Sequence, residues 1–233
     1  MTLTRRERLR ENTREEIKSI ARKHMQEQGT AAISLRAIAR DMGLTVTALY
    51  RYYPSHDDLV TALIVDAFNA LADTMEQADS SQPRERYAER LMAVMLAYRE
   101  WAMQNSGDFQ LIYGNPIPGY HAPREVTVPA VVRGFRVVVG ILAEAMANGE
   151  LQPSDEYQHL PPHVSAYMTE LIERDGYNIP LQPMYLGVSG WVKMHGMIML
   201  ELFHHTPSVV GDPEEFYRFE INNILKSAGL SLK

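Results

Sequence analysis

The chain has 233 residues, of which 45% are hydrophobic, with a formal net charge of −6 and no cysteine. This length suits one or two domains with a proper apolar core. The lack of cysteine excludes a disulfide framework and thiolate chemistry, and it suits a cytoplasmic protein. No apolar run approaches the roughly 18 residues of a membrane span, and no signal-peptide pattern follows the charged start, so we expect no membrane partner.

Charge is distributed unevenly along the chain. Residues 1–56 hold 11 basic and 6 acidic residues, a net charge of +5, whereas the rest of the chain carries a net charge of −11. A basic head on an acidic body indicates a phosphate-binding domain attached to a second domain. We expect residues 1–12 to form a flexible basic arm. The arginines of this arm are consistent both with DNA contacts and with a solvated charge run.

The first helix is expected to begin at Thr13, because Thr13 and Glu16 form the capping-box pattern T-R-E-E. Apolar residues at helical spacing follow from Ile17, and Gly29 is expected to end the helix. His24 lies on the apolar stripe of this helix. We interpret it as a packed core histidine and not as a ligand.

Residues 34–53 show the pattern of two short helices joined by a tight turn. Ser34 is a suitable N-cap for the first helix and Thr45 for the second. Gly43 stands where the chain must turn with a positive φ, and Leu49 points back toward the first helix. Any pair of packed helices can show this pattern, but the basic surroundings favour a DNA-reading helix-turn-helix.

A connecting helix is expected over residues 56–78. Pro54 is expected to end the preceding short helix, and Ser55 with Asp58 forms a second capping box. The apolar side chains cover a wide angle of the connecting helix, which indicates packing on two partners. Its N-terminus near His56 is expected to face a phosphate, because free amides and the helix dipole favour an anion there.

The segment SLRAIARDMGLTVTALYRYYPSHDDLVTALI resembles the N-terminal domain of the TetR family of bacterial transcriptional regulators. The residues that match the family's pattern are Ser34, Ile38-Ala39, Gly43, Leu49-Tyr50, Tyr53, Pro54 and Ser55, and the likeness covers residues 13–64 without gaps. The family usually has a lysine after the serine, and this chain has His56. That departure weakens a fixed charge contact to phosphate or makes it dependent on pH.

The resemblance implies that the second short helix, about residues 45–52, lies in the major groove and that a two-fold dimer binds a palindromic operator. The implied base contacts come from Thr47 and Tyr50, with apolar contact from Val46 and with Arg36 reaching a guanine or a phosphate. The implied phosphate contacts come from Ser34, Thr45, Arg51, Tyr53 and His56. For Tyr53 the alternative is a core aromatic beneath the connecting helix.

The rest of the chain also shows helical spacing, so we predict an all-α fold. Residues 1–56 are expected to form the DNA-binding domain, residues 56–78 the connecting helix, and residues 84–233 a helical effector-binding and dimerisation domain. Further helices are expected over about 84–104, 109–114, 127–149, 162–175, 183–205 and 213–228. Thr127 is the expected cap of one of them and Gly176 the expected stop of another.

The penultimate expected helix is apolar almost all round. Its glycines Gly187, Gly190 and Gly196 each cost about 1 kcal/mol against alanine in a helix unless close packing requires them. Two long C-terminal helices with this much apolar surface predict a homodimer through a four-helix bundle, although the bundle could be entirely intramolecular. The run Gly190-Trp191…His195-Gly196 resembles the WHG subgroup of TetR-like C-terminal domains.

The resemblance also implies a small-molecule effector that binds the C-terminal domain. The candidate pocket residues are aromatic or polar side chains of the middle helices, each of which is also consistent with an ordinary core position: Tyr98, Trp101, Phe109, Tyr113, Tyr120, Trp191 and His195. Trp191 and His195 lie one helical turn apart and can share a face. We expect the effector to release DNA, whereas a corepressor would tighten DNA binding.

A helical-bundle enzyme and an adaptor that does not bind DNA are the alternatives. The sequence holds no H-E-x-x-H, G-x-S-x-G, P-loop or dinucleotide fingerprint, so we predict no enzyme and no cofactor. His159 and His163 have metal-like spacing, but Pro161-Pro162 interrupts the helix that would align them, so no metal is expected. Salt-dependent binding to a palindromic DNA would reject both alternatives.

Overall fold

The computed structural model describes residues 4–174 and 177–232, and within them the fold is all-α, as predicted. The chain divides into two compact units. The first unit comprises residues up to Asn69 together with Asn105–Val131, and the second comprises Ala70–Gln104 together with the residues from Val132 onward. Residues 105–131 therefore pack with the N-terminal unit, although they were expected to belong to the effector domain. The functional domain boundaries stay a prediction.

Two sequence predictions lie outside the described residues. They are the start of the expected arm, residues 1–3, and the expected helix stop at Asp175 and Gly176.

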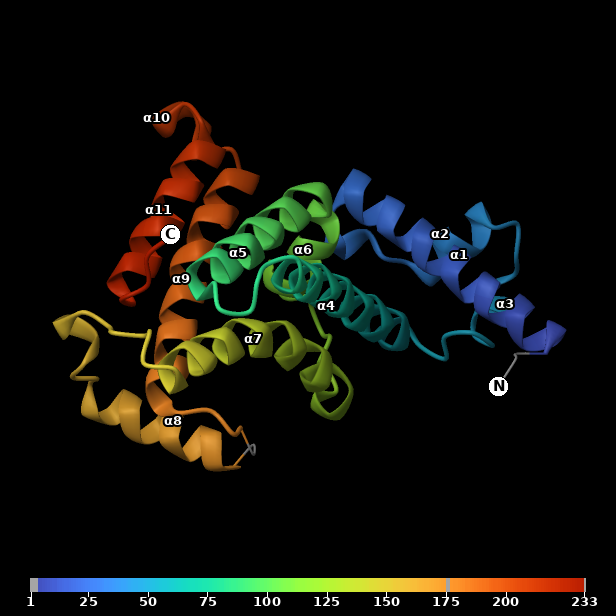
Figure 1. The fold of residues 1–233 in the computed structure, drawn as a ribbon. Helices are drawn as coiled ribbons and strands as arrows, with labels where there is room; N and C mark the ends of the chain where they lie inside the picture. Colours follow the sequence, from blue (N-terminus) through green and yellow to red (C-terminus); the bar gives the residue numbers. More distant parts are fainter. Residues whose placement is uncertain (1–3, 175–176, 233) are drawn as a thin grey trace. The chain divides into compact units, whose positions relative to one another are not determined.

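The first unit holds the helix-turn-helix (Figure 1). Its elements are α1 (Arg5–Gln28), the 3-10 turn η1 (Thr30–Ala32), α2 (Leu35–Asp41), α3 (Val46–Leu49), α6 (Ser106–Tyr113) and the first parts of α4 (His56–Ser80) and α7 (Arg124–Ala147). Apolar side chains at helical spacing meet in one core, where Ile17, Ile38 and Leu63 are fully buried. His24 is buried beside them, which confirms the interpretation as a packed histidine.

The helix α1 begins earlier than the sequence predicted. The Thr4 hydroxyl accepts a hydrogen bond from the amide of Glu7 at 3.3 Å, and the Glu7 carboxylate accepts one from the amide of Thr4 at 2.8 Å. Thr13 lies inside the helix and donates to the carbonyl of Leu9 at 3.0 Å. The prediction of a flexible arm is therefore wrong for residues 5–12. The predicted end of α1 at Gly29, where φ is 84°, is confirmed.

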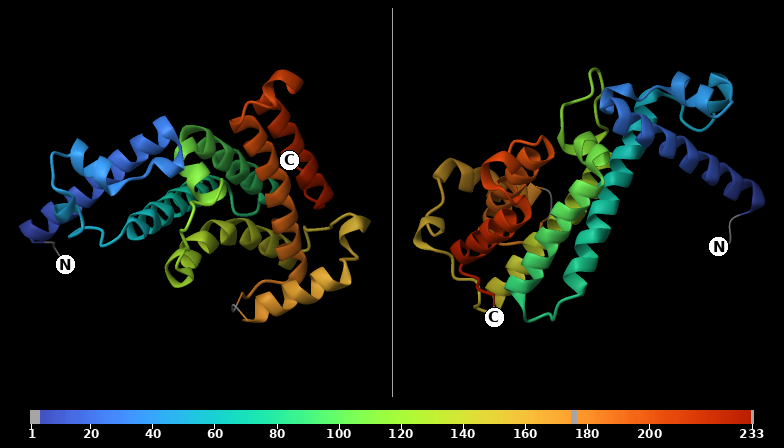
Figure 2. Two further views of the ribbon diagram at one scale, coloured as in Figure 1. Left: turned by 180° about the vertical axis from the view of Figure 1, so that it is seen from behind. Right: turned by 90° about the horizontal axis from the view of Figure 1, so that it is seen from above.

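The second unit is a bundle around α9. Its further elements are α5 (Tyr87–Gln104), the 3-10 turn η2 (Asp155–Tyr157), α8 (Pro162–Arg174), α9 (Leu181–Leu202), α10 (Pro207–Val210) and α11 (Pro213–Ser227). The helix α9 packs against α5, α8 and α11, and both views of Figure 2 show α9 beside α11. The buried Tyr217 hydroxyl of α11 donates to the carbonyl of Met95 at 2.9 Å, which ties α11 to α5.

The helix α7 begins at Arg124, so Thr127 is not its cap as predicted. Thr127 lies in the first turns of the helix, and its hydroxyl donates to the carbonyl of Pro123 at 3.1 Å. Within the described residues α7 is also the one helix long and apolar enough to be a candidate membrane span. This is weak support for a span, because α7 carries Arg133 and buries Val139 and Leu142 as the core helix of a globular protein does.

Close packing explains one of the three costly glycines of α9. A Cβ atom on Gly187 would lie 2.6 Å from Cγ1 of Val139, so the approach of α9 to α7 requires a glycine there. A Cβ on Gly190 would make an ordinary contact at 3.7 Å with Ile224. A Cβ on Gly196 would meet nothing within 4 Å, so this glycine faces open space in the single chain.

Candidate DNA-binding interface

The two caps predicted for the helix-turn-helix are present. The Ser34 hydroxyl accepts from the amide of Ala37 at 3.5 Å and begins α2. The Thr45 hydroxyl accepts from the amide of Ala48 at 3.2 Å and begins α3. Each hydroxyl satisfies an amide that the first helical turn leaves without a partner, so these residues fix where the helices start.

A Schellman turn joins the two helices. Gly43 adopts a φ of 65°, which its lack of a Cβ permits. The amide of Gly43 donates to the carbonyl of Arg40 at 3.1 Å, and the amide of Leu44 donates to the carbonyl of Ala39 at 2.8 Å. These bonds satisfy the last carbonyls of α2 and turn the chain sharply into α3.

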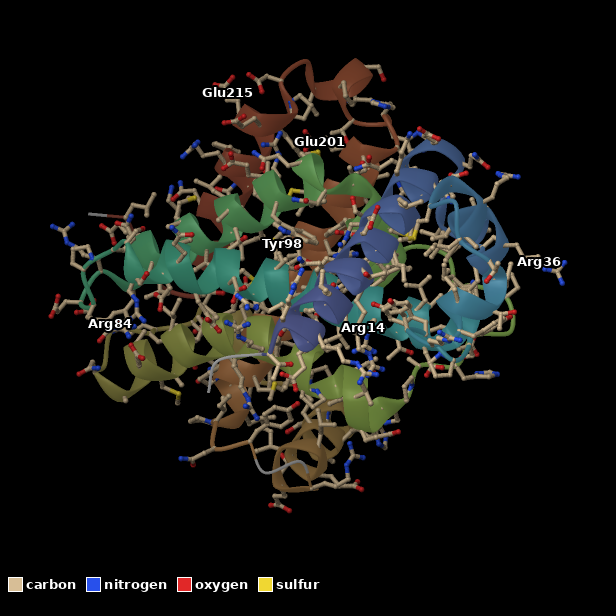
Figure 3. The ribbon with its side chains drawn as sticks, turned by 90° about the vertical axis from the view of Figure 1, so that its right-hand side faces the viewer. Arg14, Arg36, Arg84, Tyr98, Glu201 and Glu215 are labelled. Carbon is tan, nitrogen blue, oxygen red and sulfur yellow. The ribbon has the colours of Figure 1, made fainter. Side chains whose placement is uncertain are left out.

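Most of the predicted contact residues lie on the open face of these helices. Leu49 is fully buried and Ala39 nearly so, and these two residues mark the inner face of the helices, opposite the open face. The exposed candidates are Arg36, Thr45, Thr47, Tyr50 and Arg51, and the half-buried ones are Ser34, Val46 and His56. Tyr50, directly after α3, is 49% exposed although it is a large aromatic residue. Figure 3 shows Arg36 pointing away from the helices.

The helix α3 is shorter than the predicted span of residues 45–52. It ends at Leu49, and the amides of Tyr52 and Tyr53 both donate to the Leu49 carbonyl, at 2.8 and 3.1 Å. The prediction that Pro54 ends the helix is therefore wrong, because the chain has already left the helix in tight turns. The side chains at the start of α3 are unaffected by this difference.

Tyr53 lies in the core of the first unit. Its side chain is 4% exposed, and burial raises the pKa of its phenol. The guanidinium carbon of Arg14 lies 5.3 Å from the centre of the Tyr53 ring. This placement favours the alternative reading of Tyr53 as a core aromatic.

His56 is held against the protein at the start of α4. Its Nε2 lies 3.1 Å from the carbonyl of Ile33, so Nε2 donates to the backbone. Its Nδ1 lies 3.2 Å from the carboxylate of Asp57. Ser55 caps α4 as predicted, by accepting from the amide of Asp58 at 3.1 Å. With Asp57 and Asp58 both in the first turn, this helix end attracts a phosphate less than an uncharged one would.

A hydrogen bond joins α1 to the end of α2. His24 Nε2 lies 2.7 Å from the carboxylate of Asp41, and this contact with the His24 ring lowers the pKa of Asp41. The helix-turn-helix is thus tied to α1 as well as to the core.

The sequence did not predict the role of the N-terminal part of α1. There, Arg10 and Arg14 reach the residues that follow α3. A groove of about 710 Å³ lies between the two segments, lined by Thr4, Arg6, Glu7, Leu9, Arg10, Thr13, Arg51 and Tyr52. The sequence signal that could have predicted this start of α1 is a second T-x-x-E capping-box pattern, at Thr4 and Glu7.

The candidate effector residues form separate sets in the two units. In the second unit, the Tyr98 hydroxyl lies 3.4 Å from Nδ1 of His195, and the rings of Trp191 and His195 are centred 5.2 Å apart. Trp101 is buried one turn along α5 from Tyr98 (Figure 3 labels Tyr98). Burial lowers the pKa of His195, so the ring is held in its neutral form.

The remaining candidates belong to the first unit. Phe109 and Tyr113 of α6 are centred 5.2 Å apart, and Tyr113 meets Phe68 edge-on at 5.6 Å. The Tyr120 hydroxyl lies 2.9 Å from that of Thr61. Phe109 is fully buried, as an ordinary core residue is.

A capped helix-turn-helix with exposed polar side chains on one face, within the basic residues 1–56, defines a DNA-binding regulator. Comparison with known proteins identifies its family. Residues 17–63 match the family described as bacterial regulatory proteins, tetR family, and residues 91–224 match the tetracyclin repressor-like C-terminal domain. The chain belongs to the TetR family of transcriptional regulators.

Relatives and a solved structure agree with this assignment. The chain is 32% identical over 194 residues to the HTH-type transcriptional regulators Mb1846 of Mycobacterium bovis and Rv1816 of Mycobacterium tuberculosis, covering 83% of this chain and 82% of each relative. The crystal structure of a candidate regulatory protein, SCO4313, superimposes with a TM-score of 0.78 at 29% identity, covering 96% of this chain and 100% of that one.

Proposed function

We propose that this TetR-family regulator is a cytoplasmic homodimeric repressor, released from a palindromic operator by a small-molecule effector. The observation that carries the DNA-reading part is the exposure pattern of α2 and α3, where Leu49 is buried while Thr47 and Tyr50 face outward. The short polar side chain of Thr47 in α3 and the aromatic side chain of Tyr50, which directly follows α3, can bond base edges and contact the thymine methyl group.

The proposed contacts divide into two groups. Thr47, Tyr50 and Val46 meet the bases, and Arg36 meets a guanine or a phosphate. Ser34, Thr45 and Arg51 hold the phosphate backbone and so set the register on the duplex. Tyr53 acts from the core, by supporting α3. His56 contributes less than a lysine would, because its Nε2 is used by the Ile33 carbonyl.

The proposed effector site lies in the second unit and includes Tyr98, Trp101, Trp191 and His195. A phenol, an imidazole and two indoles provide apolar faces with a few hydrogen-bonding groups, which suits a small aromatic or partly polar compound. We also propose the narrower likeness to the WHG subgroup, which rests on the run Gly190-Trp191…His195-Gly196. The chain has two tryptophans, and both belong to this set, so tryptophan fluorescence would report effector binding.

The DNA-reading proposal is tested with Arg36→Ala/Tyr50→Ala. Sequences that the wild-type protein binds are first selected from random duplexes, and the variant is then compared with wild type in gel shifts. We expect the double substitution to abolish specific binding, because one bidentate guanine contact alone is worth about 1–3 kcal/mol. Arg84→Ala, which removes an exposed arginine of the second unit outside α9 and α11, is the matched control.

Undiminished affinity of Arg36→Ala/Tyr50→Ala for the selected DNA would contradict this site assignment. Light scattering should show the same oligomer for the variant and the wild type, because both substitutions lie in the first unit. A screen for compounds that release the DNA then identifies the effector. Tighter binding in the presence of a compound would identify a corepressor.

A further inference from the structure

The N-terminal part of α1 extends beyond the segment that the family shares. Residues 17–63 match the family, whereas α1 begins at Arg5. We call residues 5–16 the α1 extension; at 3.6 residues per turn it spans about three turns. Arg6, Arg10 and Arg14 recur in it every four residues and therefore lie along one side of the helix.

This side of the extension contacts the chain directly after α3. Nη2 of Arg10 donates to the carbonyl of Arg51 at 3.4 Å, and Nη2 of Arg14 donates to the carbonyl of Tyr52 at 3.2 Å. Carbonyls that follow the last turn of a helix have no partner within the helix. Two guanidinium groups satisfy them here, and a positive charge is favourable at a helix C-terminus.

Arg14 is confined on a second side by an aromatic ring. Its guanidinium carbon lies 5.3 Å from the centre of the Tyr53 ring, which is itself buried. The side chain is thus held between a ring fixed in the core and a carbonyl at the end of α3. Such an arrangement fixes the backbone that follows α3, the proposed recognition helix, relative to the core.

The helix α3 needs support of this kind. It has only four residues, Val46–Leu49, and one turn of helix is held by too few hydrogen bonds to keep its own direction. The Thr45 cap fixes its start, and the buried Leu49 fixes its inner face. At its end, the two arginine contacts add to the hydrogen bonds that the Leu49 carbonyl accepts from the amides of Tyr52 and Tyr53.

We propose that Arg10 and Arg14 are positioning residues that brace α3, the proposed recognition helix, so that Thr47 of α3 and Tyr50 directly after it meet the bases at a fixed angle. The consequence for DNA binding rests on the proposed function. A brace acts on specificity, because base contacts need accurate placement whereas attraction to the phosphate backbone does not. A direct phosphate contact would act on affinity for any sequence.

The first test does not require DNA. Amide hydrogen exchange is compared between wild type, Arg10→Ala/Arg14→Ala, and the control Arg5→Ala/Arg8→Ala, which removes two exposed arginines of the same extension. In the brace variant we expect residues 49–53 to exchange about tenfold faster, the effect of losing roughly one charged hydrogen bond. The control should exchange there as wild type does.

Equal exchange of residues 49–53 in all three proteins would overturn the brace. The amides of α9, in the second unit, show whether a variant has lost stability as a whole. If the double variant does not fold, Arg10→Ala alone replaces it, because Arg10 is exposed and its contact with the Arg51 carbonyl can be removed without touching the core.

The second test measures binding to the selected DNA and to a scrambled duplex over a range of salt concentrations. We expect Arg10→Ala/Arg14→Ala to lower the ratio of specific to non-specific affinity about tenfold, and Arg5→Ala/Arg8→Ala to change that ratio less than about twofold. The slope of log affinity against log salt should be the same for Arg10→Ala/Arg14→Ala as for wild type, because a bracing arginine contacts no phosphate and the slope counts phosphate contacts.

An unchanged ratio, with a slope reduced by about 0.9 for each lost contact only in Arg10→Ala/Arg14→Ala, would identify the arginines as phosphate contacts and overturn the brace. If wild-type protein selects no DNA sequence, the proposed DNA reading fails. The exchange experiment then still decides whether Arg10 and Arg14 hold the end of α3.

Discussion

At the scale of single residues, Gly187 shows how close packing selects a glycine. Alanine at this position would place its Cβ 2.6 Å from Val139, so Gly187→Ala should lower the free energy of unfolding by about 1–3 kcal/mol through overpacking. Gly140 of α7 is the matched control, because a Cβ there meets nothing within 4 Å. Gly140→Ala should stabilise by about 0.5–1 kcal/mol, since alanine is the better helix former.

Urea denaturation of both variants measures this difference. Equal shifts in the urea midpoints of the two variants would show that helix propensity alone decides the effect and that α9 does not require a glycine at position 187.

His195 gives the second unit a dependence on pH. Burial lowers the pKa of His195 below the ordinary value of 6.5, so between that lowered pKa and 6.5 the unfolded chain binds more protons than the folded one. The free energy of unfolding should therefore fall as the pH drops from about 7 through 6.5, and it should be constant above about 7.5. His195→Gln should flatten this dependence, as shown by melting temperatures from pH 5 to 8.

The control for this pH series is His163→Gln, which removes an exposed histidine of α8. A wild-type slope that persists in His195→Gln would assign the pH dependence to another group.

At the scale of elements, one buried arginine ties α5 to the end of α4 and to α7. Arg90 is 1% exposed, its Nε donates to Asp79 at 2.7 Å, and its Nη1 donates to Glu144 at 2.6 Å. Arg90→Ala removes a buried guanidinium and leaves Asp79 with only the exposed Arg84 as a partner, so it should cost about 3 kcal/mol. Arg133 pairs with Asp73 and Glu76 at the surface, and Arg133→Ala should cost less than about 1 kcal/mol.

Guanidinium chloride denaturation of the two variants checks this contrast. Losses of similar size would mean that burial of the Arg90 network adds nothing to the stability of the second unit.

The elements also show how far the sequence could predict the fold. Helical spacing, Gly43 and the caps at Ser34 and Thr45 predicted the helix-turn-helix, because each is a local property of the chain. The predicted starts of α1 and α7 were wrong. For α1 the reason is again local. The pattern T-x-x-E occurs at Thr4 and again at Thr13, and the arginines, glutamates and leucine between them are good helix formers, so only the structure decides which pattern caps the helix.

The candidate site was predicted less completely, because exposure and pairing depend on packing. The family resemblance implied DNA contacts for both Tyr50 and Tyr53, with a core position as the alternative for Tyr53, and the fold exposes Tyr50 and buries Tyr53. It also could not predict that Arg14 reaches the carbonyl of Tyr52, because 38 residues separate them along the chain.

At the scale of the whole molecule, the proposed dimer follows from an apolar surface that one chain leaves exposed. We define the α9–α11 face by Val192, Gly196 and Leu200 of α9, by Phe203 directly after α9, and by Phe216 and Phe219 of α11. Leu200 is 52% exposed and Phe219 is 61% exposed. Large apolar side chains gathered on neighbouring helices are typical of a subunit interface, and a two-fold axis would place the same face of a second copy on them.

Leu200→Glu tests this face, because a carboxylate there would be buried without a partner in the dimer but solvated in the monomer. We expect the variant to be monomeric by light scattering and to bind the full selected site at least about 100-fold more weakly, since the two half-sites are no longer linked. Its affinity for a single half-site should be unchanged. Met146→Glu places the same charge on an exposed methionine of α7, which is not one of the residues of the α9–α11 face, and should remain dimeric. A dimeric Leu200→Glu protein would move the interface to another surface, and a monomeric wild type would contradict the palindromic operator, because one recognition helix reads only one half-site.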